Sequence, residues 1–401
     1  MAYGVNIDLR KTNKRNLIID LFRRNEYLSK IQAKKLSGYS MDTVLSIFDG
    51  LARDELIVPS EGAQKPKGRK AVFFRLNGEK LYYLGVTFNQ ARILSTLVDF
   101  SNRVRDTATT ELALGIGREQ FLEIFRRHLG EFSARLAGVA GRIRNIGCSI
   151  PGDIDAATGV LRSYVFMPFL EGVNFCDILH EFFPEREIEV EHNIRSMTSY
   201  VLYSSDLVRR YRKILFVSAR SGAASGLIHH GEIVTDRGEM GHVRVSDEDR
   251  RCACGRRGCL DLYFSHQSIS EAISSLGAGS GAAAGHHDLQ EIISLYGNDA
   301  PGVRAMMDER LRYFSSALLD MVNILEPDLV ILSGELLEAY GDPVARIRAA
   351  LAVEYADSGS VTNLKNAEII FMKTGIEIAA TGVCYHLINK HWGYVENGDL
   401  A

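Results

Sequence analysis

The hydrophobic positions near the start of the chain repeat with the period of α-helices. Between residues 15 and 53 they mark one face of three successive helical stretches. Ser29 followed by Gln32 forms a capping box that opens the second helix, and Ser40 is placed to cap the third. The residues expected to face inward are Leu17, Ile18, Leu21 and Phe22 in the first helix, Ile31 and Leu36 in the second, and Val44, Ile47, Phe48 and Leu51 in the third.

The turn between the second and third helices, residues 37–39, is short and contains a glycine, which is typical of a helix-turn-helix. Two apolar runs, 56–58 and 71–76, then predict strands on either side of a basic loop, so the module would be winged. Its third helix would enter the major groove of DNA, and the loop would contact phosphates or the minor groove. Winged helices also serve as protein-interaction modules, and that alternative stays open. The candidate DNA contacts are Ser40, Met41, Thr43 and Ser46 in the helix, and Lys67, Arg69 and Lys70 in the loop.

From residue 81 onward, strand patterns alternate with helical ones. Residues 82–98 alternate between apolar and polar positions around a central turn, which predicts a hairpin, and residues 118–145 follow a helical period. This order predicts an α/β body with mixed sheets, and 321 residues are enough for two lobes. Four further short strands are expected at residues 146–150, 188–190, 214–217 and 329–332.

Charge divides the chain at the same place. The whole chain carries a formal net charge of −3 at pH 7. Residues 1–80 hold 16 Lys and Arg against 9 Asp and Glu, a balance of +7, whereas residues 81–401 hold 31 against 41, a balance of −10. A basic end on an acidic body suggests that the basic end binds a polyanion. We therefore expect a winged helix-turn-helix domain at 1–80 that binds double-stranded DNA, followed by the α/β body at 81–401.

The composition is that of a folded globular protein. The chain has 401 residues, of which 46% are hydrophobic and 24% charged, and this excludes a disordered chain or a coiled-coil rod. Six cysteines are too few for a disulfide scaffold. No apolar run approaches the roughly 18 residues of a membrane span, and the first residues lack the apolar segment of a signal peptide. We expect a cytoplasmic protein without a membrane partner.

Three cysteines within eight residues form the strongest chemical motif. Cys252, Cys254 and Cys259 are spaced by two glycines that permit sharp turns, and such a set suits one metal ion. A closed structural zinc site needs four ligands, commonly three cysteines and one histidine, and the nearest upstream histidine is His242. Buried thiols without a metal, or a redox sensor, are the weaker alternatives. Cys148, Cys176 and Cys384 stand singly in apolar surroundings and are expected in the core.

Glu-Met-Gly-His at 239–242, followed by CxCGxxGC at 252–259, resembles the signature of the ROK family, which groups repressors, open reading frames and sugar kinases. Segments 149–152, 190–193 and 326–334 resemble other parts of the family pattern in the right order. The basic N-terminal module resembles that of the repressor branch, to which the xylose and N-acetylglucosamine repressors belong.

The resemblance implies a body of two lobes around a cleft, with the sugar-kinase and actin-like (ribonuclease H-like) fold. It also implies that His242, Cys252, Cys254 and Cys259 hold a structural Zn²⁺. Sugar hydroxyls both donate and accept hydrogen bonds, so carboxylates, amides and imidazoles suit them. The implied sugar contacts are Gly152, His192, Asn193, Glu239, His242 and Asp261.

Three departures from the family pattern concern the chemistry of phosphate transfer. Where the kinases place a catalytic Asp, this chain has Asn193, which cannot act as a general base. The first phosphate loop, at 84–88, lacks its Asp and one Gly, and the second, at 220–226, has lost two glycines. Asp261 replaces the last sugar-contact Glu and is one methylene shorter. Kinase activity is therefore not expected.

These features favour a sugar-responsive transcriptional regulator, a repressor of carbohydrate genes, acting as a homodimer or a dimer of dimers. An ATP-dependent sugar kinase with an accessory domain is the alternative enzyme. A regulator controlled by a protein partner, with a vestigial sugar site, is a third possibility. The effector would be a sugar or a sugar phosphate, and Arg195 or Arg220 would either hold the phosphate or form salt bridges.

Overall fold

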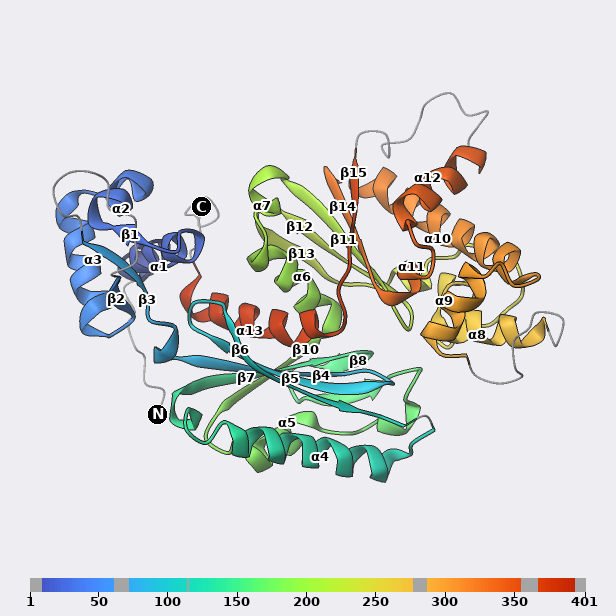
Figure 1. Cartoon of the computed structure of the whole chain (residues 1–401), viewed down its shortest axis with the longest axis horizontal. Helices are drawn as coiled ribbons and strands as arrows, with labels where there is room; N and C mark the ends of the chain where they lie inside the picture. Colours follow the sequence, from blue (N-terminus) through green and yellow to red (C-terminus); the bar gives the residue numbers. More distant parts are fainter. Residues whose placement is uncertain (1–8, 61–71, 114, 277–286, 355–366, 394–401) are drawn as a thin grey trace.

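The computed structural model describes residues 9–60, 72–113, 115–276, 287–354 and 367–393. Within these ranges the chain forms a small N-terminal group of elements and two lobes, each built on a five-stranded sheet (Figure 1). The mixed α/β architecture predicted from the sequence is thereby confirmed. In the same ranges, no helix combines the length and the apolar character that crossing a membrane requires.

The N-terminal group, blue in Figure 1, combines three helices with an antiparallel sheet in the order β1–β3–β2. Both predicted caps are present: the Gln32 amide donates to Ser29 Oγ and the Thr43 amide donates to Ser40 Oγ, each at 3.2 Å. The strand β1, which pairs with β3, is not predicted by the sequence pattern. The elements are α1 (Leu9–Arg24), β1 (Leu28–Ser29), α2 (Lys30–Ser37), α3 (Met41–Arg53), β2 (Ile57–Ser60) and β3 (Phe73–Leu76).

The predicted inward face of the second helix is wrong. Ile31 is 66% exposed and Leu36 is 53% exposed, and α2 instead buries Ala33. Five residues of helix turn through about 500°, so Ile31 and Leu36 lie about 140° apart and cannot share one buried face. The third helix packs nearly as predicted, with three of its four inward residues buried and Ile47 partly buried.

The first lobe is built on a sheet with the order β10–β7–β4–β5–β6. The predicted hairpin is present as the antiparallel pair β4 and β5, and β7 runs parallel to both β4 and β10. One face is covered by α4 and α5 (Figure 1), where Phe121 and Phe125 pack against Phe88 of β4. The elements are β4 (Tyr82–Phe88), β5 (Arg92–Asp99), β6 (Val104–Glu111), α4 (Arg118–Arg135), β7 (Ile143–Ile150), β8 (Asp153–Asp155), β9 (Val160–Ser163), α5 (Phe175–Phe182) and β10 (Glu187–His192).

The helix expected at 118–145 is too long. The helix α4 ends at Arg135, and residues 143–145 already belong to β7. Between them the chain contains Gly138 and Gly141, which disfavour helix, and apolar residues continue across the break. A helical period therefore cannot be distinguished there from the start of a buried strand.

The second lobe is built on a sheet with the order β13–β12–β11–β14–β15, in which β11, β14 and β15 are parallel. Its largest hydrophobic cluster joins this sheet to the long helix α10 and its neighbours. The elements are α6 (Asn193–Ser204), α7 (Leu207–Arg210), β11 (Lys213–Ala219), β12 (Ala223–His229), β13 (Glu232–Gly238), α8 (His266–Ser275), α9 (Leu289–Gly297), α10 (Val303–Leu325), β14 (Leu329–Ser333), α11 (Glu335–Glu338), α12 (Pro343–Glu354), β15 (Glu368–Met372) and α13 (Glu377–Trp392).

Two helices lie between the sheets of the two lobes (Figure 1). The helix α13 packs on β4, β5 and β7 of the first lobe, and α6 packs on β12 and β13 of the second. They meet at Gly382, where an added Cβ would lie 1.8 Å from the backbone oxygen of Ser196. This contact requires glycine, and it fixes how closely the two central helices approach each other.

The far end of α13 contacts the N-terminal group. Trp392 lies edge-on to Phe100, with ring centroids 5.3 Å apart, and Phe100 is buried in the core of the N-terminal helices. The Asn16 side chain in α1 donates to the Gly393 carbonyl at 2.8 Å. One helix therefore connects the region between the lobes to the N-terminal group.

Candidate functional site

Four metal-ligand side chains converge beside the second lobe. The ligand atoms of His242, Cys252, Cys254 and Cys259 all lie within 4.8 Å of one another. His242 ends a short 3₁₀ turn after β13, and the cysteines follow in a tight loop. Gly258 in that loop has φ +67°, and an added Cβ would overlap the Ser246 carbonyl oxygen, so glycine is needed for the chain to turn there.

The separations within this cluster fit a tetrahedral site. Cys254 Sγ lies 3.7 Å from Cys259 Sγ, and Cys252 Sγ lies 3.6 Å from His242 Nδ1. Zn–S bonds of about 2.3 Å in a tetrahedron place sulfur atoms about 3.8 Å apart. Burial and the two neighbouring thiols raise the pKa of Cys259 to about 12, so three thiolates are not stable here without a cation. The predicted cluster of ligands is thus present and is suited to a metal ion.

A cavity of about 400 Å³ lies next to this cluster, and Cys252 and His242 belong to its wall. All six residues that the sequence analysis assigned to a sugar line the same cavity. They come from separate elements: Gly152 follows β7, His192 ends β10, Asn193 begins α6, Glu239 and His242 follow β13, and Asp261 lies in a later 3₁₀ turn.

Asp261 is the most enclosed carboxylate of this cavity. Its Oδ1 accepts a hydrogen bond of 3.0 Å from the Ala223 amide. An added Cβ at Gly222 or Gly241 would lie within 2.8 Å of its carboxylate, so both glycines make room for it. Burial raises the pKa of Asp261 to about 6; the Ala223 amide and His242 oppose this rise, and Glu239 adds to it.

His192 has a structural contact as well as a place in the cavity wall. Its Nδ1 accepts a hydrogen bond of 3.3 Å from the Ile194 amide and so caps α6. This contact fixes the ring at the point where β10 passes into the helix, and leaves Nε2 as its other polar atom.

Family membership follows from comparison with known proteins. A sequence model of the ROK family matches residues 85–383. The chain belongs to the ROK family.

Two solved structures share this ROK fold. A ROK family transcriptional regulator, a homologue of the E. coli MLC protein, has a TM-score of 0.73 at 16% identity, over 96% of this chain and 98% of its own. The ROK hexokinase of Thermus thermophilus has a TM-score of 0.59 at 19% identity, over 77% of this chain and 99% of its own. Among characterised sequences, the xylose repressor of Bacillus spizizenii is 21% identical over 354 residues, covering 86% of this chain and 87% of its own.

The segment at 220–226, whose glycines depart from the kinase pattern, makes several internal contacts. Arg220 donates to the carbonyl oxygens of Thr374 at 2.7 Å and Gly375 at 3.1 Å, and is ion-paired with Glu335. In the same loop, Ser221 Oγ donates to Gln90 Oε1 of the β4–β5 turn at 3.2 Å. Ser221 thus connects this segment to the turn that follows residues 84–88.

Both arginines considered as phosphate ligands take part in ion pairs. Arg220 pairs with Glu335, and Arg195 Nε lies 3.3 Å from Glu191 Oε2. Of the two roles that the sequence left open for these arginines, the salt-bridge role is present in the structure.

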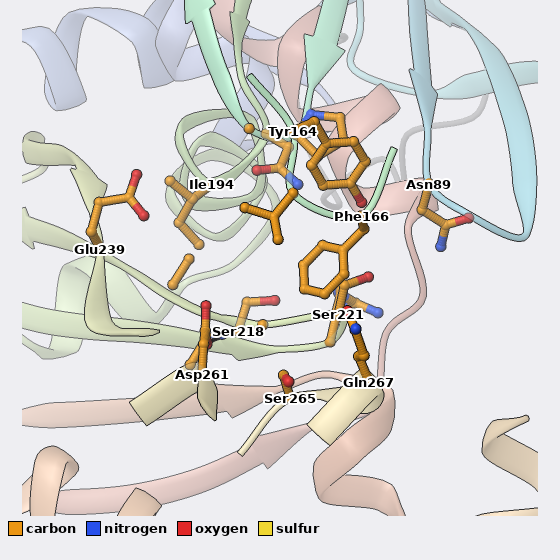
Figure 2. A pocket seen from close by; sticks show the side chains of 18 of the residues that line it. Asn89, Tyr164, Phe166, Ile194, Ser218, Ser221, Glu239, Asp261, Ser265 and Gln267 are labelled. Carbon is orange, nitrogen blue, oxygen red and sulfur yellow. Dashed lines mark hydrogen bonds between the residues drawn. The ribbon is translucent and has the colours of Figure 1, made fainter. Parts of the chain in front are cut away.

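Several cavity residues carry no motif and were not predicted. Tyr164 and Phe166 follow β9, Asn89 lies in the β4–β5 turn, and Gln267 lies in the first turn of α8. Figure 2 shows Glu239 and Asp261 on one side of the cavity, and Asn89 and Gln267 on the other. The run of aromatic residues at 164–169, shortly after the Pro-Gly turn, is the one sequence signal that could have indicated this wall.

The candidate DNA-contact residues of the N-terminal group divide into two sets. On α3, Ser40 and Ser46 are exposed, and Met41 and Thr43 are partly exposed. Ser40 Oγ and Thr43 Oγ1 lie 2.8 Å apart, so these two hydroxyls also bond to each other. Leu45, which was not predicted, is exposed on the same helix. Lys67, Arg69 and Lys70 lie outside the described residues.

Proposed function

We propose that this chain is a sugar-responsive, DNA-binding transcriptional repressor of carbohydrate genes. In this proposal residues 1–80 form a winged helix-turn-helix domain, and residues 81–401 form the body that binds the effector and dimerises. One observation carries this proposal: a group of three helices and a short antiparallel sheet precedes a ROK body. The cavity of that body is lined by all six candidate sugar contacts. The transcriptional regulator matches 96% of the chain, whereas the hexokinase matches 77%.

The DNA contact would be made by α3 and the loop that follows β2. In a winged helix the N-terminal part of the recognition helix reaches base edges, so we assign this role to Ser40, Met41, Thr43 and Ser46. Lys67, Arg69 and Lys70 would contact phosphates or the minor groove. The balance of +7 in residues 1–80 supports a polyanion as partner. Double-stranded operator DNA is thus the proposed partner of this domain.

The sugar would be held by Gly152, His192, Asn193, Glu239, His242 and Asp261. Carboxylates accept from sugar hydroxyls, and the amide and imidazoles both donate and accept, so this set matches a polyhydroxylated ligand. We assign Zn²⁺ to the His242, Cys252, Cys254 and Cys259 cluster, because three thiolates and one imidazole at these separations suit zinc. Since His242 also lines the cavity, the metal would fix the orientation of a sugar-binding side chain.

We propose that the chain is not a kinase. Asn193 cannot take a proton from the attacking hydroxyl, and the positive charge of Arg220 is already paired with Glu335. The hydrogen bond between Ser221 and Gln90 connects the segment at 220–226 with the turn that follows residues 84–88, and in this proposal no nucleotide binds between them.

The effector signal would reach the DNA-binding domain through α13. Ile376 lines the cavity and immediately precedes α13, and Trp392 at the other end contacts the N-terminal group. A dimer binds two half-sites whose spacing must match that of its two recognition helices, so a small rotation weakens DNA binding. We therefore propose a homodimer, or a dimer of dimers, as the acting form.

The decisive experiment is a mobility-shift assay of the purified chain with the DNA upstream of its own gene. We expect binding that weakens steeply as salt rises, and that is lost when Lys67, Arg69 and Lys70 are changed together to Ala. As a matched control, Lys373 and Lys390, which lie in the body outside the proposed DNA-binding domain, are changed to Ala; we expect much smaller losses. The absence of binding to this DNA and to a random genomic pool at low salt would contradict the proposal.

The alternatives have their own measurements. ATP-dependent phosphorylation of any hexose, lost in Glu239→Ala, would establish the kinase instead. If DNA binds but no sugar stabilises the protein in a thermal-shift panel, control by a protein partner replaces control by a sugar.

A further inference from the structure

The cavity contains two chemically different regions. Figure 2 shows the carboxylates of Glu239 and Asp261, two of the candidate sugar contacts, at one end. At the other end lie Phe166 and the amide side chains of Asn89 and Gln267. The first region is acidic. The second combines an aromatic ring with two amides that are partly engaged: Gln267 Nε2 donates to the lining carboxylate of Glu271 at 2.8 Å, and Asn89 Oδ1 accepts from the Ala91 and Arg92 amides.

The aromatic wall is held in place by its neighbours. Tyr164 is buried, and burial raises the pKa of its hydroxyl to about 12, against a smaller opposing effect of Ser221 of the opposite lobe, so the hydroxyl keeps its proton. Phe166 packs edge-on against Tyr164, with ring centroids 5.7 Å apart. Phe166 itself remains partly exposed and lines the cavity. Its ring is therefore a fixed surface available to a ligand.

The size of the cavity exceeds the need of one sugar ring. An apolar cavity of about 150 Å³ holds one benzene, or about 25 Å³ for each non-hydrogen atom, so a hexose of about 12 such atoms needs about 300 Å³. The cavity measures about 400 Å³. On the same scale a disaccharide of about 23 such atoms needs about 575 Å³, so part of a second ring would extend past the exposed lining residues Gln267 and Ser163 towards solvent.

The charges that line the cavity as a whole disfavour a phosphate group. Two arginines line the described cavity: Arg220 is ion-paired with Glu335, and Arg250 lies over the Tyr263 ring, 5.2 Å from its centroid. Four lining carboxylates, among them Glu239 and Asp261, face the same space. A phosphorylated ligand would bring like charges together in this cavity, which is costly.

We infer that the effector is an uncharged disaccharide. The first ring occupies the region of Glu239 and Asp261, and the second ring stacks on Phe166 and bonds to Gln267 and Asn89. The apolar face of a pyranose suits an aromatic ring, and its rim of hydroxyls suits amide side chains. This inference rests on the proposed sugar response and specifies its ligand class.

The test is calorimetric titration of the full chain with matched sets. Each set contains a disaccharide, the monosaccharides that compose it, and the 6-phosphate of one of them. We expect one disaccharide to bind roughly tenfold more tightly than its monosaccharides, and the phosphate to bind most weakly. In Phe166→Ala most of the difference between disaccharide and monosaccharide should disappear.

Phe169→Ala is the matched control, because Phe169 belongs to the same segment but is not among the cavity-lining residues and packs on Phe121. This variant should keep the disaccharide preference, and circular dichroism and zinc content show whether each variant is folded. A monosaccharide or a sugar phosphate that binds as tightly as every disaccharide would overturn the inference while leaving the sugar response intact. Failure of every sugar to bind would instead overturn the proposed function.

Discussion

Trp392 is the residue whose removal should separate the two parts of this protein. It ends α13, and its indole N–H donates to the Tyr83 hydroxyl at 2.9 Å. Its ring also packs against Phe100, and the guanidinium groups of Arg15 and Arg144 each lie 5.9 Å from the ring centroid. Arg15 belongs to α1 and Arg144 to β7, so the indole contacts both the N-terminal group and the body.

These contacts set the size of the expected effect. The hydrogen bond contributes about 1 kcal/mol, the aromatic pair about 1 kcal/mol, and the two cation–π contacts about 0.5 kcal/mol each. Trp392→Ala should therefore lower the free energy of unfolding by about 3 kcal/mol, measured by urea denaturation. Trp392→Phe keeps an aromatic ring but loses the hydrogen-bond donor, so this variant should lower the free energy of unfolding by about 1 to 2 kcal/mol.

The same substitution should uncouple sugar binding from DNA binding. In Trp392→Ala we expect the protein still to bind sugar and operator DNA, each with its wild-type affinity. The effect of bound sugar on the affinity for DNA should shrink towards none. Calorimetry with sugar, and mobility shifts with and without sugar, give the three quantities. If the sugar still changes DNA affinity by the wild-type factor, α13 does not carry the signal and our reasoning about this contact is wrong.

Three further predictions concern stability. Cys259→Ser should lower the zinc content, measured by atomic absorption, and should destabilise the second lobe by several kcal/mol. The control is Cys148→Ser, which changes a buried thiol outside the cluster and should retain zinc. The pKa of the buried His128 ring is lowered to about 4, mainly by burial and further by Arg135. Between about pH 4 and pH 6.5 the unfolded state therefore binds more protons than the folded state. His128 contributes up to about 3 kcal/mol of stability, which is complete above pH 6.5 and should be lost as the pH falls through that range. If the loss of stability at acid pH is unchanged in His128→Gln, this prediction is contradicted. Gly382→Ala should lower the free energy of unfolding by more than about 3 kcal/mol in the same denaturation assay. The new methyl group would meet the backbone of Ser196, which cannot move aside as a flexible side chain could. Gly50→Ala, where an added Cβ has open space, should have no destabilising effect, and equal losses in the two variants would refute the steric argument.

The parts of the structure that the sequence predicts are those encoded by neighbouring residues. The caps at Ser29 and Ser40 depend on residues three positions away, and the metal cluster depends on one short loop and a histidine ten residues before it. Both are present as predicted. The six candidate sugar contacts were identified by family resemblance, and the structure brings them to one cavity without testing their role.

The parts that were missed depend on partners far apart in the sequence. The contacts of Arg220 with Thr374 and Glu335 join residues more than a hundred positions apart, so no local pattern reveals whether this arginine is available to a ligand. The strand β6 has alternating exposed and partly exposed residues at the edge of its sheet, and lacks the apolar signal of a buried strand. The burial of Phe100 among the N-terminal helices depends on the tertiary packing of the body.

The contacts around Arg220 bear on our proposal that the chain is not a kinase. Arg220 belongs to the segment whose glycines depart from the kinase pattern; its guanidinium is paired with Glu335 and donates to the Thr374 carbonyl oxygen. Ser221 in the same segment donates to Gln90 of the β4–β5 turn. The other arginine among the described lining residues, Arg250, lies over the Tyr263 ring. We therefore expect the wall near Phe166 to bind a neutral second sugar ring rather than a phosphate group.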